Sequence, residues 1–320
     1  MFKSFTIPEF NDLDIKNRNK NNSTLFQLPS FIDYHKDKFE NIVFVYFLNN
    51  EPIAYMTVNK NKNYLYSHQG STYGGFVQLE TISSNECRKI IESFFSKIKE
   101  LKIDKFYVRF APKIFLNPDF SLLNEIFKSY LKYNYEEELT YINLKNFDGS
   151  NLKNSNFSRN HIRDIKNFSE NKNIKITKVD SKNLDLYFDI LRLNLKKFNK
   201  LPTHTKNELL YLIENFPNNV QINLLSVGNE NVAGVTKFIL NSSTVHIFYG
   251  SLNYKLIEKY KGALKYLYKY EIDNAKEKGF NYLNFGVDVH FGDEPNNNLR
   301  KFKMGFGGVN TVRSSYFYEL

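Results

Sequence analysis

The sequence contains no tryptophan, a single cysteine and no long apolar run. Cys87 alone cannot form an internal disulfide, so nothing in the chain requires an oxidising compartment. The N-terminus lacks the apolar core and the small-residue cleavage site of a secretory signal. The longest apolar run, residues 42–48, is far too short to span a bilayer. We therefore expect a soluble cytoplasmic protein, with peripheral membrane contact left open.

Short motifs that mark several common enzyme classes are also absent. The chain has no His-x-x-x-His or Cys-x-x-Cys pair, no Gly-x-Ser-x-Gly turn, no Walker loop and no Rossmann fingerprint. These absences argue against a zinc site, a serine hydrolase, a P-loop enzyme and a dinucleotide-binding domain. We therefore predict no metal and no tightly bound cofactor.

The charge of the chain is strongly positive. Its 44 Lys and Arg residues against 34 Asp and Glu residues give a formal net charge of +10. This excess fits an anionic partner such as acyl-CoA, a nucleotide-sugar, a lipid-linked glycan or tRNA, and it equally fits a solvated lysine-rich surface. Charge alone does not choose between these alternatives.

Two segments about 175 residues apart have the same order of predicted elements, which indicates a duplicated domain rather than a solenoid. Each reads as a β-hairpin, a third strand, an amphipathic helix and a fourth strand. The helices are predicted near residues 90–101 and 264–275, and the fourth strands at 105–110 and 282–285. A strand-helix-strand crossover makes the last two strands parallel. The polar stretch 146–151 marks the predicted boundary, giving domains 1–150 and 151–320.

Four stretches, residues 71–76, 159–163, 275–286 and 299–308, resemble the FemAB-like acyltransferases, which are tandem members of the GNAT superfamily and include peptidoglycan aminoacyl ligases. The resemblance spans nearly the whole chain. It implies an α/β (α+β) fold of two duplicated GNAT-like domains, each a mixed twisted sheet flanked by helices. It also implies an acyltransferase of the EC 2.3 class, with domain two catalytic and domain one on the scaffold or acceptor side.

The reaction implied by the resemblance is N-acyl transfer from acyl-CoA, as co-substrate, to an amine on a small-molecule or lipid-linked cell-envelope glycan or peptidoglycan precursor. Two alternatives remain open. In one, aminoacyl-tRNA is the donor, as in Fem-type ligases; in the other, the chain is a noncatalytic basic module that binds RNA or a membrane surface. Residues 258–263 depart from the glycine-rich pyrophosphate loop of acyl-CoA users, because they contain one glycine. Residues 167–210 lack the coiled-coil arm of some tRNA-dependent ligases.

Acyl transfer needs a proton acceptor for the amine and donors aimed at the developing oxyanion. The resemblance assigns the oxyanion role to Lys303, in the pair Phe302-Lys303. Asp288 or His290, directly after the predicted fourth strand, would accept the amine proton. Tyr249 would orient substrate or protonate the leaving group, or it is a packing tyrosine.

The remaining predicted site residues are binding residues. The donor would contact the third strand of domain two and the loop before its helix, at Gly250, Ser251, Lys259, Lys261 and Gly262. The acceptor would contact Arg159, Arg163, Arg300, Phe302, Tyr73 and Gly74. Guanidinium groups suit phosphate recognition, although Arg159 and Arg163 also fit a solvated basic helix.

Overall fold

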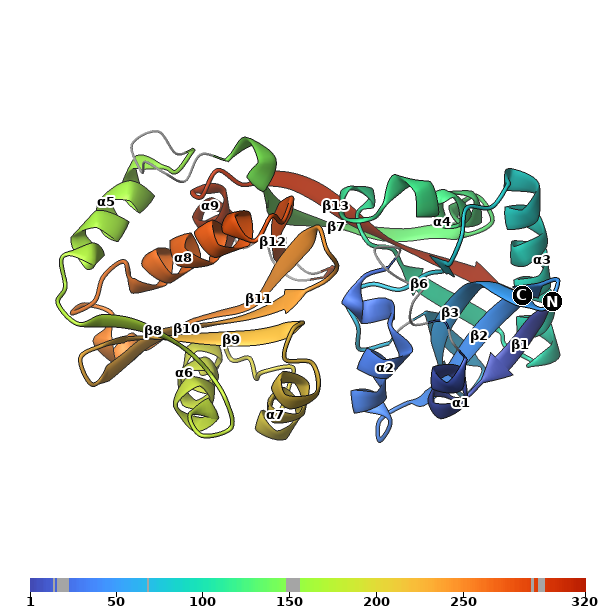
Figure 1. The fold of residues 1–320 in the computed structure, drawn as a ribbon, viewed down its shortest axis with the longest axis horizontal. Coiled ribbons are helices and arrows are strands. Elements are labelled where there is room, and N and C mark those ends of the chain that lie inside the picture. The colour runs from blue at the N-terminus through green and yellow to red at the C-terminus, as the bar shows by residue number, and fades with distance from the viewer. Residues whose placement is uncertain (14, 16–22, 68, 148–155, 289–290, 293–296) are drawn as a thin grey trace. The chain divides into compact units, whose positions relative to one another are not determined.

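A computed structural model describes residues 1–13, 15, 23–67, 69–147, 156–288, 291–292 and 297–320 (Figure 1). The chain divides into two compact units. Unit 1 comprises Met1–Glu138, Leu240–Ser242 and Val312–Leu320, and unit 2 comprises Leu139–Ile239 and Ser243–Thr311. In this division Leu139 begins unit 2, and the last nine residues, Val312–Leu320, join unit 1.

Unit 1 begins with β1 (Phe2–Phe5), α1 (Ile7–Asp12) and α2 (Pro29–Ile32). A hairpin, a third strand, a helix and a fourth strand follow as predicted: β2 (Glu40–Leu48), β3 (Glu51–Asn61), β4 (Tyr64–Ser67), α3 (Ser84–Glu100) and β6 (Lys105–Arg109). The short β5 (Val77–Gln78) pairs with β3. Next come α4 (Leu122–Lys128) and β7 (Lys132–Asn143), whose last five residues belong to unit 2. Single 3₁₀ turns lie at Leu25–Gln27, Asp33–His35, Lys113–Phe115, Pro118–Phe120 and Leu144–Asn146.

Unit 2 repeats this order. It contains α5 (Arg159–Ser169), β8 (Ile174–Lys178), α6 (Leu184–Lys196), α7 (Lys206–Asn215), β9 (Val220–Val227), β10 (Glu230–Ile239) and β11 (Thr244–Leu252). A 3₁₀ turn at Tyr254–Leu256 leads to α8 (Ala263–Glu277), β12 (Tyr282–Val287) and α9 (Asn297–Met304). The chain ends with β13 (Val309–Glu319), which belongs to unit 1 from Val312 onward. In both units the third and fourth strands are parallel, β4 with β6 and β11 with β12, which confirms the predicted crossover.

The final strand of each repeat completes the sheet of the other unit. In unit 1 the hydrogen-bonded order is β1-β2-β3-β4-β6-β13, and in unit 2 it is β7-β12-β11-β10-β9-β8. Ser315 of β13 pairs with Arg109, and Asn143 of β7 pairs with Tyr282, both in antiparallel register. The predicted mixed α/β sheet with a duplicated unit is therefore confirmed, with the terminal strands exchanged.

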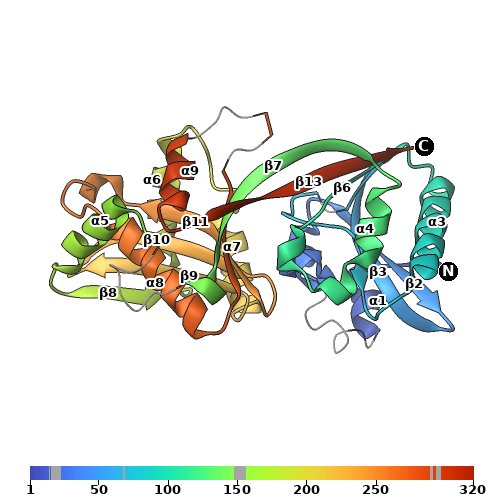
Figure 2. The same ribbon diagram turned by 90° about the horizontal axis from the view of Figure 1, so that it is seen from above.

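Helices cover both faces of each sheet because their apolar residues recur at helical spacing. In unit 1, α3 buries Cys87, Ile90, Ile91, Phe94 and Ile98 against one face, and its N-cap Ser83 accepts a hydrogen bond from the Glu86 amide. In unit 2, α5 lies beside α8 on one face, whereas α6 and α7 cover the other (Figures 1 and 2).

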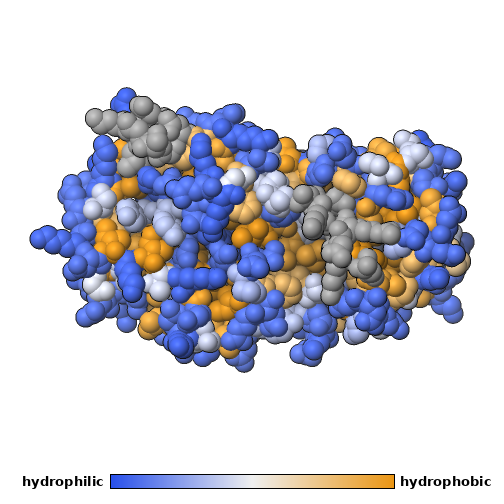
Figure 3. Space-filling view, viewed as in Figure 1, coloured by the Kyte–Doolittle hydropathy of each residue, from blue (hydrophilic) through white to orange (hydrophobic). Residues whose placement is uncertain are grey.

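The surface is mainly polar, as expected for a chain with this charge. The face drawn in Figure 3 carries hydrophilic side chains interspersed with apolar ones. Within the described part of the chain, no helix combines the length and the apolar character that crossing a membrane would require.

A buried ion pair ties α8 to the sheet of unit 2. Lys237 of β10 and Glu271 of α8 form a salt bridge at 2.5 Å, with side chains only 6% and 1% exposed. The Asn223 amide donates to the second carboxylate oxygen of Glu271. A charge buried this deeply is tolerated only while its partner remains.

We predict that Glu271→Gln lowers the free energy of unfolding by about 3–5 kcal/mol, because the Lys237 ammonium stays buried without a counter-charge. Urea unfolding followed by circular dichroism measures the loss. Asp189→Asn is the matched control, since it breaks the exposed pair with Arg192 and should cost less than about 1 kcal/mol. Equal midpoints for the two variants would contradict the prediction.

Candidate active site

The parallel strands β11 and β12 separate at their carboxyl ends. They pair only from Thr244 to His246 and from Tyr282 to Asn284. Beyond that point β12 shifts register against β7 between Asn284 and Val287, and Gly286 adopts a φ of +75°. We call the space between Ile247–Leu252 and Phe285–Val287 the β11–β12 gap. Open α/β sheets bind ligands at such carboxyl ends.

Tyr268 of α8 lies over this gap. Its ring stacks on Phe285 and Phe306, with centroids 5.6 and 5.5 Å apart, and meets Phe302 edge-on at 5.3 Å. A Cβ at position 250 would lie 2.1 Å from the Tyr268 hydroxyl oxygen, so only glycine lets the hydroxyl approach the β11 backbone. Burial raises the pKa of Tyr268, which keeps the hydroxyl protonated.

Lys303 of α9 is buried beside the gap, with 6% of its side chain exposed. Its ammonium donates to the carbonyl oxygens of Gly286 (2.9 Å) and Val287 (2.8 Å) and to the carboxylate of Asp288 (2.9 Å). The other Asp288 oxygen accepts from the Thr140 hydroxyl at 2.8 Å. Burial lowers the pKa of Lys303, and Asp288 opposes that shift. The structure therefore brings Lys303 and Asp288 together, and it is not consistent with a surface lysine.

Each ammonium proton of Lys303 has one of these acceptors, so contact with an oxyanion would require exchanging one of them. The predicted oxyanion role of Lys303 and base role of Asp288 remain predictions. His290 lies outside the described residues.

His161 of α5 holds α9 in position. Its Nε2 lies 2.9 Å from the Phe302 carbonyl oxygen, which can only accept, so Nε2 donates and Nδ1 accepts from the Ser158 hydroxyl at 2.9 Å. The ring also meets Phe306 edge-on at 4.5 Å. Burial lowers the pKa of His161 to about 4, and the Lys265 charge acts in the same direction. Two of the stretches that carried the family resemblance therefore contact each other here.

Tyr249 faces the opposite side of the β11 strand from Gly250. Its hydroxyl accepts from the His204 backbone amide at 3.3 Å and lies 3.0 Å from His204 Nδ1. Ser251, also predicted for donor binding, is fully buried. The structure thus brings Gly250, Phe302, Lys303 and Asp288 to the gap and directs the Tyr249 side chain to His204.

The predicted phosphate-binding loop is occupied by the protein's own groups. Lys259 pairs with Glu230, and Lys261 is exposed. Gly262 has a φ of +91°, and a Cβ there would lie 2.3 Å from the Asp164 carbonyl oxygen. The Asp164 carboxylate pairs with Lys265 in the first turn of α8. An internal carboxylate therefore lies at the helix N-terminus, where a diphosphate would otherwise bind.

The predicted acceptor residues are spread over several elements. Arg159 and Arg163 are exposed on α5, and Arg163 pairs with its neighbour Asp164 at 3.2 Å. Arg300 is exposed on α9. In unit 1, Tyr73 is buried against Phe26, and the Gly74 amide donates to the Arg109 carbonyl at 2.8 Å. Their binding roles remain predictions.

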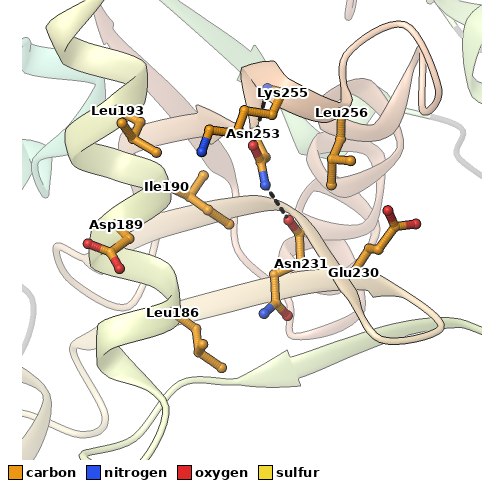
Figure 4. Close-up of a pocket in the computed structure, with 9 residues that line it drawn as sticks. All are labelled: Leu186, Asp189, Ile190, Leu193, Glu230, Asn231, Asn253, Lys255 and Leu256. Carbon is orange, nitrogen blue, oxygen red and sulfur yellow. Dashed lines mark hydrogen bonds between the residues drawn. The ribbon is translucent and has the colours of Figure 1, made fainter.

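A cavity of about 330 Å³ in unit 2 lies between α6, the β9–β10 turn and the residues after β11 (Figure 4). Leu186, Ile190 and Leu193 of α6 form one wall, and Asn253 donates to the Asn231 carbonyl at 3.0 Å. Asp189, Glu230 and Lys255 also line it. Two carboxylates against one ammonium make this cavity a poor phosphate site.

Comparison with known proteins identifies the fold of the chain. No protein-family model matches the chain, and no curated protein does. Among solved structures, FemX superposes with a TM-score of 0.74 at 11% identity, over 100% of this chain and 97% of FemX. The L-PGS structure from Bacillus licheniformis gives 0.53 at 15% identity, over 83% and 81% of the two chains. A tandem GNAT protein from the clavulanic acid biosynthesis pathway gives 0.51 at 7% identity, over 100% and 98%.

The sheet order, the crossover helices and these similarities define a GNAT acyltransferase fold. Within that class the chain has the FemAB-like, tandem form of the fold, as the sequence resemblance implied.

Two contributors to the site were not predicted from the sequence, Tyr268 at the gap and Asp164 at the N-terminus of α8. Tyr268 shares the apolar stripe of α8 with Leu267, Ile272 and Ala275, so helical periodicity assigned it to the core. Asp164 follows Arg163 in a polar run, and nothing in that run indicates that Asp164 lies at the N-terminus of α8. The glycine at 250 was a usable signal, because a glycine within a strand often marks a close approach.

We predict that acid destabilises the protein partly through His161. The folded pKa of about 4 lies below the ordinary value of 6.5, so the unfolded chain takes up the proton first as the pH falls. The contribution of His161 to the free energy of unfolding is therefore fully present above pH 6.5. It is lost as the pH falls toward 4, and the loss reaches about 3 kcal/mol. His161→Gln, which retains a donor for Phe302, should flatten this part of the stability–pH curve. An unchanged slope would contradict the assignment.

We also predict that Lys303→Met lowers the free energy of unfolding by about 3–5 kcal/mol, because Asp288 stays buried without its counter-charge. Lys301→Met is the control, since Lys301 is exposed on the same helix. Urea titrations of both variants test this. A Lys303→Met midpoint no lower than that of Lys301→Met would show that the buried contacts contribute little.

Proposed function

We propose that unit 2 catalyses transfer of an acyl group from an activated ester or thioester to an amine, with the reacting carbonyl bound in the β11–β12 gap. The observation that carries this proposal is the end of the β11–β12 ladder at His246 and Asn284. Backbone amides at the end of a strand can polarise a carbonyl placed against them. The GNAT acyltransferase fold of the chain supports this assignment.

In our proposal, Tyr268 is the proton donor to the leaving group. The amine nitrogen attacks the carbonyl carbon, a carbon–nitrogen bond forms, and the bond to the leaving oxygen or sulfur breaks. The Tyr268 hydroxyl gives its proton to the leaving group, and the tyrosinate takes up the proton that the amine nitrogen loses. The position of that hydroxyl against Gly250 supports this role. Burial raises its pKa, so the hydroxyl carries its proton when the donor binds. The Lys303 ammonium acts as a positioning group in this scheme, because it fixes the carbonyls of Gly286 and Val287.

The donor we favour is aminoacyl-tRNA rather than acyl-CoA. The GNAT fold is consistent with acyl-CoA as co-substrate. The loop before α8 does not fit its diphosphate, because Asp164 lies at the helix N-terminus and Glu230 pairs with Lys259. Placing phosphate oxygens beside the Asp164 carboxylate would bring like charges together. A net charge of +10 supports a polyanionic donor.

The acceptor in this proposal is an amine on a cell-envelope glycan or peptidoglycan precursor. It follows from the resemblance of the four sequence stretches to FemAB-like enzymes. The FemX-like fold over the full chain supports it.

The test follows radiolabelled amino acids from charged total tRNA into soluble amine-bearing glycan precursors, in parallel with labelled acetyl-CoA. We expect transfer from tRNA only, and a fall in kcat of about 10²–10⁴-fold in Tyr268→Phe, which keeps the ring stack but lacks the proton donor. Tyr270→Phe is the control, because Tyr270 is exposed on the same helix.

Transfer from acetyl-CoA but not from tRNA would overturn the proposed donor. Full activity of Tyr268→Phe would remove Tyr268 from the mechanism. Salt-sensitive binding of tRNA without transfer from either donor would instead favour the noncatalytic basic module.

A further inference from the structure

The sheet of unit 1 has a solvent-accessible region on one of its faces, at strand β6. Phe106 and Val108 of β6 belong to the apolar cluster that α3 and α4 complete on the other face. Successive side chains of a strand point to opposite faces, so Lys105, Tyr107 and Arg109 lie away from that cluster. All three are partly exposed. Helices α1 and α2 pack on this second face at β2 and β3.

Aromatic rings form a row across this face. Tyr107 pairs in register with Tyr66 of β4 on one side and with Phe317 of β13 on the other. The Tyr66 and Tyr107 rings stack, with centroids 5.2 Å apart and planes at 12°, and the Phe317 ring lies 6.2 Å from Tyr107. Tyr64 meets Tyr107 edge-on at 6.5 Å and is 43% exposed. We call these four residues the aromatic platform.

Two lysines lie against the β13 end of the platform. The ammonium groups of Lys105 and Lys132 lie 5.2 and 5.9 Å from the centroid of the Phe317 ring. Both contact the carboxylate of Glu319, at 3.0 and 3.6 Å. Two ammonium groups thus share one carboxylate, which leaves a net positive charge beside the rings.

Arg109 adds a further positive charge, two residues after Tyr107 on the same face of β6. The nearest carboxylate printed for it belongs to Glu137, whose oxygen lies 3.8 Å from Arg109 Nε. That oxygen accepts a hydrogen bond from Arg313 at 2.8 Å, and both of these partners are buried. The Arg109 side chain is 33% exposed. Its charge therefore reaches solvent largely uncompensated.

Exposed rings on a sheet with cations around them suit one class of ligand. Unpaired nucleic acid bases stack on aromatic side chains, while Lys and Arg contact the phosphates. The bases of a duplex already stack on each other and hide their faces, so a duplex cannot use such rings. Tyr66 and Tyr107 are already stacked in the free protein. A base would therefore extend a preformed column instead of ordering it.

We propose that the aromatic platform of unit 1 binds single-stranded nucleic acid, with bases stacked on its tyrosine rings and phosphates on Lys132 and Arg109. Binding at this site does not depend on acyl transfer in unit 2 or on the nature of the acyl donor. Each of the two proposals can therefore fail while the other stands.

The test is fluorescence anisotropy of the full-length protein with labelled oligouridylate, oligothymidylate and an RNA duplex of equal length, at one salt concentration. We expect at least one single strand to bind at least tenfold more tightly than the duplex, and neutral dextran not to displace it. Because the duplex has the higher charge density, this preference reports stacking on bases rather than charge. The two single strands distinguish RNA from DNA.

Tyr64→Ala should weaken binding of the single strand about 5–150-fold, as expected for the loss of one stacked base, and leave its salt dependence unchanged. Lys132→Gln should instead lower the slope of log affinity against log salt by about 0.7, the value for one phosphate contact on a single strand. Tyr270→Ala is the matched control, because it removes a tyrosine that is 38% exposed on α8 of unit 2, and it should bind normally.

Tyr107→Leu repeats the test at the centre of the platform, since it keeps an apolar side chain in the strand and lacks the ring. Circular dichroism melting checks that each variant is folded. The proposal is overturned if neither single strand binds more tightly than the duplex, or if dextran displaces the strand. It is also overturned if Tyr64→Ala and Tyr107→Leu both bind like the unmodified protein, or if Tyr270→Ala loses as much affinity as they do.

Discussion

The contact on which the candidate site depends is the buried ammonium of Lys303 at the end of β12. It binds the carbonyls of Gly286 and Val287, which lie beyond the point where the parallel ladder with β11 ends. Carbonyl oxygens buried without donors are costly, so the lysine lets β12 leave β11 without losing hydrogen bonds. Asp288 compensates the charge, and Thr140 anchors Asp288 to β7. The gap is thus held open by one ion pair with satisfied partners on both sides.

Helix α5 contacts both the helix that carries Lys303 and the N-terminus of α8, where a donor diphosphate would bind. His161 and Asp164 are three positions apart, so they lie on one face of α5. The two residues contact different elements. His161 bonds to the Phe302 carbonyl and so fixes α9, which carries Lys303. Asp164 packs against Gly262 and pairs with Lys265 at the start of α8. The helix that supports the gap therefore also fills the anion-binding end of α8. A donor would have to be recognised through other groups.

The sequence allowed the architecture to be predicted because its signals are local. Helical periodicity in α3 and α8, the hairpin turns and the repeated order of elements each depend on neighbours in the chain. The exchange of β7 and β13 between the units was not predictable, since either strand fits either sheet by pattern alone. At the site, Lys303 was predicted through family resemblance, and Asp288 through its position directly after the predicted fourth strand. The contact of Tyr249 with His204 could not be predicted, because strand alternation does not say which face of β11 the gap ligand uses. Tyr268 was not predicted as a site residue, because its place in the helical periodicity of α8 indicates a core residue.

The two repeats differ at the one place where the chemistry is proposed. In unit 2 the parallel ladder ends after three pairs. In unit 1 the equivalent ladder runs through Ser67 and Val108, and Gly74 then bridges to Phe110 while its amide donates to Arg109. The Ser67 hydroxyl accepts from the Gly75 amide and closes the turn. Backbone groups that could polarise a carbonyl in unit 2 are therefore used by the chain itself in unit 1. This difference between the repeats supports placing the proposed chemistry in unit 2.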